Sequence, residues 1–133
     1  MIPASVQDTV NKLTELAKKA DPVQAEVALR YARWLITRHK YQKMPEGDWW
    51  SVWLFLAGRG SGKTRTAAEN LWKLAWDNPN TRWLVSAPTY SDVKDVCFLG
   101  ESGLVNVMPR SIIARHVVSD NELHLINGSM IKG

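Results

Sequence analysis

The sequence predicts an α/β fold in which a partial, mostly parallel sheet is flanked by helices and preceded by an N-terminal helical hairpin. Three patterns support this prediction. Apolar residues recur at helical spacing over the first 39 residues. An apolar run then leads through a glycine-rich turn into a further helical stretch. Short apolar runs separated by turn residues follow towards the C-terminus. A chain of 133 residues is long enough to bury one small core.

The hairpin is predicted from two amphipathic stretches. Residues 5–20 carry an apolar side chain every three or four positions and begin with the spacing of a capping box. Asp21 can cap the next helix, and Pro22 suits its first turn. That second helix is predicted from residue 23 to about residue 39, so the two helices would lie antiparallel.

The centre of the chain reads as strand, loop and helix. Residues 49–57 form an apolar run, which predicts a buried strand. A glycine-rich segment, residues 58–64, follows and reads Gly-Arg-Gly-Ser-Gly-Lys-Thr. The helical pattern then continues from Thr64 to about Trp76. This order of elements is the context that a phosphate-binding loop (P-loop, Walker A) requires.

The remaining elements are shorter. Residues 82–87 predict a second strand, parallel to the first through a right-handed crossover. A short helix is expected from Ser91 to Phe98, whereas residues 104–118 fit no single pattern. Another strand is predicted from Glu122 to Ile126. Asn127-Gly128 is a strong hairpin signal that leads into a return strand.

The glycine-rich segment has the chemistry of a nucleotide site. Glycines let successive backbone N–H groups turn towards one anion, and the helix that follows adds its positive N-terminal end. Lys63 would reach the β- and γ-phosphates of ATP, and the Thr64 hydroxyl would ligate Mg²⁺. The strict motif has glycine where this chain has Ala57, but Gly58 follows at once. The alternative is an ordinary turn whose lysine is merely solvated.

Composition permits further partners without proving them. The net charge of +4 is compatible with nucleic acid or nucleotide. Five basic residues and no acid lie between positions 30 and 43, which reads as a solvated helix face in preference to a DNA-backbone patch. Because Cys97 is the single cysteine, the chain cannot form an intrachain disulfide. We expect Cys97 to pack as a small apolar side chain within a helix. No stretch is apolar enough to predict a membrane span. An aromatic core is favoured over base stacking for Trp49, Trp50, Trp53, Trp72 and Trp76.

The loop and three further stretches resemble the ATPase of the large terminase subunit of tailed bacteriophages. Residues 53–65 carry the form Ala-Gly-Arg-Gly-x-Gly-Lys-Thr-Arg, which is closer to that family than to P-loop proteins in general. Residues 42–49, residues 87–104 and Asn127-Gly128-Ser129 look like its flanking segments. The resemblance therefore covers roughly residues 40 to 133.

The resemblance implies a motor that hydrolyses ATP to drive double-stranded DNA into a procapsid. It implies a ring of subunits on a portal protein, a small terminase subunit as partner, and the cytoplasm of the infected bacterial host as location. Gln42 would contact the adenine, and Arg59 would help to sense or stabilise the γ-phosphate; the alternatives are a loop glutamine and a surface ion pair. The residues that the resemblance assigns to nucleotide binding are Gln42, Gly58, Gly60, Ser61, Gly62, Lys63, Thr64 and Arg65.

The sequence departs from the family in one respect. An ATPase of this kind needs an acidic pair after an apolar strand, to hold Mg²⁺ and to activate water. Asp120 and Glu122 are the nearest acids but follow no suitable strand, and the nuclease carboxylates are absent. We therefore expect an N-terminal piece of a terminase that does not hydrolyse ATP alone. Residues 1–44 would be a helical extension and residues 45–133 the first part of the ATPase domain.

Two other functions remain open from the sequence. Superfamily 2 helicases also combine an upstream glutamine, Gly-Ser-Gly-Lys-Thr and a later Ala-Pro-Thr, here Ala87-Pro88-Thr89. A non-catalytic module is the other alternative, with the hairpin docking on DNA, on a portal or on a small terminase subunit.

Overall fold

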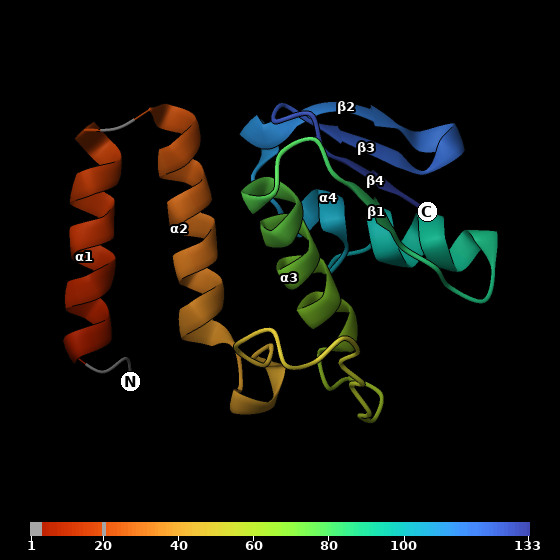
Figure 1. Ribbon diagram of the computed structural model, residues 1–133, viewed down its shortest axis with the longest axis horizontal. Coiled ribbons are helices and arrows are strands. Elements are labelled where there is room, and N and C mark those ends of the chain that lie inside the picture. The colour runs from red at the N-terminus through yellow and green to blue at the C-terminus, as the bar shows by residue number, and fades with distance from the viewer. Residues whose placement is uncertain (1–3, 20) are drawn as a thin grey trace.

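The N-terminal helical hairpin is confirmed in the computed structural model, which describes residues 4–19 and 21–133. Helix α1 spans Ala4–Lys19 and helix α2 spans Pro22–Thr37. The Asp21 carboxylate accepts the Val23 N–H at 2.9 Å and so caps α2, with Pro22 in the first turn. Figure 1 shows α1 on the outside, packed along α2, while α2 faces the rest of the chain.

Helix α3, Lys63–Asp77, lies between the hairpin and a small sheet (Figure 1). Its Trp72 and Ala75 are fully buried, and the Tyr31 ring of α2 meets the Trp72 ring edge-on at 6.3 Å. The core continues from α3 into the sheet and the short helices beneath it. Its largest apolar members are Trp72, Phe98, Leu104, Met108, Ile112, Leu123 and Ile131.

The sheet has four strands in the order β1-β4-β3-β2. Their bounds are Arg82–Leu84 (β1), Ile113–Val117 (β2), Glu122–Leu125 (β3) and Met130–Lys132 (β4). Only β1 and β4 run parallel, while β2 with β3 and β3 with β4 are antiparallel. The prediction of a mostly parallel sheet is therefore wrong for the described residues, because two of the three pairings link consecutive strands through short turns.

Short helical segments connect these elements. They are η1 (Lys40–Gln42), the π-helix η2 (Asp92–Phe98), α4 (Leu104–Val107), η3 (Arg110–Ile112) and η4 (Val118–Asp120). The helix predicted from Ser91 to Phe98 is thus present, with wider π-type turns. Cys97 lies on it, half-buried against the core as predicted, and this burial raises the pKa of its thiol.

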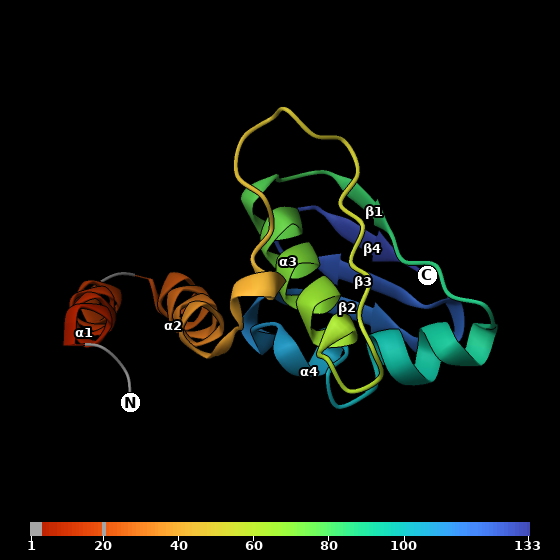
Figure 2. The same ribbon diagram turned by 90° about the horizontal axis from the view of Figure 1, so that it is seen from below.

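The predicted strand over residues 49–57 does not form. The segment is extended but pairs with no strand, so the predicted crossover to residues 82–87 is also wrong. Its even positions face solvent, with Val52, Leu54 and Leu56 exposed at 81%, 72% and 84%. Figure 1 shows it as part of an open loop below α3, away from the strands, and Figure 2 shows this loop from below, running along α3. Apolar content alone predicted burial here, and burial requires neighbouring strands that the sheet does not supply.

The tryptophans that were predicted to form an aromatic core also differ in burial. Trp72 belongs to the core as predicted, but Trp49 is 79% exposed and its indole N–H donates to the Glu46 carbonyl at 2.9 Å. Trp53 is only half-buried and lies edge-on to Phe55 at 5.7 Å.

No helix among residues 4–19 and 21–133 has the length and apolar character needed to cross a membrane.

Candidate phosphate-binding site

The glycine-rich loop forms a tight turn that ends at the start of α3. Gly60 and Gly62 have φ of +77° and +84°, in the left-handed region that glycine occupies without strain. The Ser61 N–H and hydroxyl both donate to the Gly58 carbonyl, at 3.3 and 2.5 Å. The loop therefore closes on itself without any ligand.

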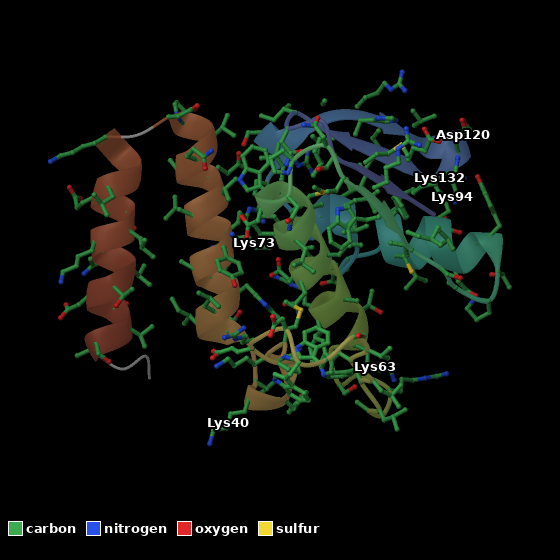
Figure 3. The ribbon with its side chains drawn as sticks, viewed as in Figure 1. Lys40, Lys63, Lys73, Lys94, Asp120 and Lys132 are labelled. Carbon is green, nitrogen blue, oxygen red and sulfur yellow. The ribbon has the colours of Figure 1, made fainter. Side chains whose placement is uncertain are left out.

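Lys63, the first residue of α3, ties the end of the loop to its beginning. Its ammonium donates to the Ala57 carbonyl at 2.6 Å and to the Gly58 carbonyl at 3.2 Å. Figure 3 shows Lys63 at the end of α3 beside the loop. A lysine held in this way presents a positive charge to any anion that enters the turn.

The N-terminus of α3 adds a second feature that favours anions. The first backbone N–H groups of a helix have no partner within the helix, and the helix dipole makes this end positive. In the described part of the chain, the N–H groups of Lys63, Thr64 and Arg65 donate to no backbone carbonyl. The Thr64 hydroxyl also has no hydrogen-bond partner there, so it is available as a ligand for Mg²⁺.

Two arginines flank the turn. Arg59 lies exposed at its tip and forms no ion pair with the described residues, so the surface ion pair considered as its alternative role is not found. Arg65 is held from within the helix, because its Nε donates to Glu69 Oε2 at 3.1 Å. Glu69 is 1% exposed and also accepts the Trp72 indole N–H at 2.8 Å. Sequence reasoning missed Glu69, although its position four residues after Arg65 was a visible signal.

A cleft of about 550 Å³ opens beside the loop. Residues 58–65 form one wall, and Asp95, Val96 and residues 100–102 form the other. The loop wall carries the basic residues, whereas the opposite wall contributes the carboxylates of Asp95 and Glu101. The sequence analysis included the segments containing these two acids in the family resemblance, but it did not predict that the acids line a cleft with the loop.

Gln42 lies under the loop, on the side away from this cleft wall. Its side chain is bonded to Gly62 and Thr66, and it also lines a second cleft of about 500 Å³. That second cleft includes Arg33, His39 and Tyr41, together with residues 60–62 of the loop. The predicted contact of Gln42 with adenine stays a prediction, but its nearness to the loop agrees with the expected arrangement.

The two acids that the sequence offered nearest to a catalytic pair lie elsewhere. Figure 3 shows Asp120 at one end of the sheet, far from Lys63. Glu122 on β3 accepts from Lys132 at 2.7 Å and lies 3.2 Å from His124 Nε2. Hydrogen bonds from Lys132 and His124 lower the pKa of Glu122, so this carboxylate is engaged on the sheet. Neither acid reaches the loop.

The basic residues around the end of α2 have separate surroundings. Arg33 lines the second cleft, whereas Lys43 pairs with Glu46 at 2.7 Å. Lys40 points away from the molecule in Figure 3. The interpretation of these basic residues as a solvated face stays a prediction.

Residues 54–132 match a protein-family model described as terminase large subunit, T4likevirus-type, N-terminal. The match covers more than half of the chain and includes the loop, α3 and all four strands. Both helices of the hairpin and Gln42 precede it. A search of the curated proteins and a search of the solved structures each find no significant match.

Proposed function

The chain belongs to the family of terminase large subunits, of the T4likevirus type, and on this premise we propose that its loop binds ATP with Mg²⁺ in a DNA-packaging motor. The observation that carries the proposal is the geometry around Lys63. One ammonium, unpaired helix N–H groups and the Thr64 hydroxyl, which has no partner among the described residues, converge on a turn with two glycines at positive φ. A polyphosphate with its metal ion is the ligand that these groups fit best.

Roles follow for the individual residues. The N–H groups of the loop would cradle the phosphates, Lys63 would neutralise the β- and γ-phosphates, and Thr64 would ligate Mg²⁺. Arg59 is free to reach the γ-phosphate, since no described acid holds it. Arg65 would contribute charge from a fixed position, because the buried Glu69 holds its Nε.

In the whole protein, ATP hydrolysis would drive double-stranded DNA into the procapsid. The subunits would work as a ring on the portal protein, with a small terminase subunit selecting the DNA, in the cytoplasm of the infected bacterium. The family match favours this function over a helicase-like motor. We propose that the present chain binds ATP without hydrolysing it, because Asp120 and Glu122 lie away from the loop. Asp95 and Glu101 do line the cleft beside the loop, but they lie on η2 and in a turn and so do not form an acidic pair after a strand.

The test is Mg²⁺-dependent ATP binding measured by isothermal titration calorimetry on the chain and on Lys63→Ala. Loss of a charged hydrogen-bonding partner is expected to weaken binding about 10- to 100-fold. Lys40→Ala is the matched control, because it removes the same charge from a side chain that points away from the molecule. Equal affinity of Lys63→Ala and Lys40→Ala would refute the proposed role of the loop.

A further inference from the structure

Gln42 is buried directly beneath the point where the loop enters α3. It is 4% exposed, and its amide nitrogen donates to the Gly62 carbonyl at 3.3 Å and to Thr66 Oγ1 at 2.9 Å. Its amide oxygen accepts the His39 N–H at 2.8 Å. An amide has two N–H donors, so both donors of Gln42 are used within the chain.

Gly62 has no side chain, and this leaves room for the Gln42 amide. A Cβ at position 62 would lie 2.6 Å from Gln42 Nε2, so any larger residue at this position would have to displace the Gln42 amide. The Gly62 carbonyl also accepts the backbone N–H and the hydroxyl of Thr66, at 2.9 and 2.7 Å. Gln42, Gly62 and Thr66 therefore form a closed hydrogen-bonded set that fixes the last residue of the loop.

The neighbouring residue of η1 reinforces this hold. The Tyr41 hydroxyl donates to the Ser61 carbonyl at 3.3 Å, and the Tyr41 ring stacks on His39 with ring centres 5.2 Å apart. Two successive residues of η1 thus hold two successive carbonyls of the loop. Because η1 directly follows α2, the loop is anchored to the helical hairpin as well as to α3.

We propose that Gln42 is a positioning residue, which orients the loop for the phosphates of the nucleotide and does not read the base. This inference rests on the proposed function. Reading adenine with a glutamine amide takes one donor and one acceptor together. Gln42 could supply the donor only by releasing Gly62 or Thr66 and leaving a buried polar group unpaired, which is unfavourable.

The two roles predict different ligand profiles. If Gln42 positions the loop, its loss disorders Gly62 and the N–H groups of Lys63 and Thr64 that follow. Binding of every polyphosphate then weakens by the same factor. If Gln42 reads adenine, only ATP is affected, and ligands without adenine bind as before.

The experiment measures Mg²⁺-dependent binding of ATP, GTP and inorganic tripolyphosphate to the chain by calorimetry. Gln42→Ala is expected to weaken all three about tenfold and to leave the ATP-to-GTP ratio unchanged. Gln42→Glu keeps the acceptor for His39 but as a carboxylate cannot donate to Gly62, so it should weaken all three ligands at least as much as Gln42→Ala. Gln7→Ala, on the exposed face of α1, is the matched control and should bind like the unmodified chain.

A double-mutant cycle with Thr66→Val separates positioning from a general loss of folding. Thr66→Val removes the hydroxyl that Gln42 contacts but keeps the bond from Gln42 to the Gly62 carbonyl, so Gln42→Ala should cost less affinity in that background than in the unmodified chain. Thermal unfolding of each variant shows that the folded state is intact at the temperature of measurement. Additive losses, or a loss confined to ATP, would overturn the inference. Failure of the unmodified chain to bind any of the three ligands would instead overturn the proposed function, and the inference with it.

Discussion

Replacing Asn127 with alanine is expected to destabilise the chain more than its place in a hairpin turn suggests. The Asn127 amide donates to the carbonyls of Ala75 and Trp76, at 2.9 and 2.8 Å. Its side-chain oxygen accepts the Ser129 N–H at 3.0 Å. One side chain in the turn between β3 and β4 therefore caps the C-terminus of α3, about fifty residues earlier in the sequence.

The magnitude follows from these three hydrogen bonds. Each contributes about 1 kcal/mol net, so their loss costs about 3 kcal/mol if no water replaces them. The groups are half-buried, and solvent entering the gap would reduce the loss to about 1.5 kcal/mol. With a urea m-value of about 2 kcal/mol/M, the unfolding midpoint should fall by about 0.8 to 1.5 M.

The assay is urea unfolding followed by tryptophan fluorescence, since Trp72 is fully buried. Asn11→Ala, on the exposed face of α1, is the control and should change the free energy of unfolding by less than about 0.5 kcal/mol. Asn127→Asp should be at least as damaging as alanine at pH 7, because it puts a negative charge at the negative end of the helix dipole. Its stability should recover as the pH falls and the carboxyl becomes protonated. An Asn127→Ala midpoint equal to that of Asn11→Ala would refute the reasoning.

Two further predictions concern the hairpin and the extended segment. Glu26 accepts the backbone N–H groups of Arg110 and Ser111, at 3.1 and 3.3 Å, and hydrogen bonds from the Ser111 side chain and from these backbone groups lower its pKa. The resulting stabilisation is complete above the ordinary glutamate pKa and is lost as the pH falls through the lowered one. The difference in unfolding free energy between the unmodified chain and Glu26→Gln should thus be about 1 kcal/mol at pH 7, after allowance for solvent screening, and vanish once the pH is well below the lowered pKa of Glu26. Hydrogen exchange should be much faster for the amides of residues 52–57 than for those of α3, and equal protection would show that the segment is paired after all.

The sequence predicted the elements whose signals are local. Glycines followed by lysine and threonine predicted the loop, and Asn127-Gly128 predicted the turn between β3 and β4. Both are present, with φ of +84° at Gly62 and +87° at Gly128. Asp21 and Pro22 likewise predicted where α2 begins. Each of these structures depends on residues within a few positions of one another, so the sequence contains the whole cause.

Signals that depend on distant partners were less informative. Residues 49–57 have the composition of a buried strand, but pairing depends on other strands, and the described sheet places none beside them. The contact of Gln42 with Gly62 joins residues twenty positions apart, and the cap from Asn127 to α3 spans more than fifty. Periodicity and spacing indicate which face of a helix or strand is apolar. They do not indicate which side chain of another element contacts that face.

Helix α3 explains how the loop can form although the segment before it is unpaired. At its N-terminus Gln42 holds the Gly62 carbonyl, and at its C-terminus Asn127 holds the Ala75 and Trp76 carbonyls. Between them the buried Glu69 accepts hydrogen bonds from Arg65 and Trp72. Glu69 therefore links Arg65, a side chain of the site, to Trp72, a side chain of the core. The helix is therefore positioned at both ends by hydrogen bonds that do not involve residues 52–57. Because Lys63, Thr64 and Arg65 lie in its first turn, their placement depends on α3. The extended segment adds the Ala57 carbonyl to which Lys63 donates, and the Phe55 ring that packs on Tyr41.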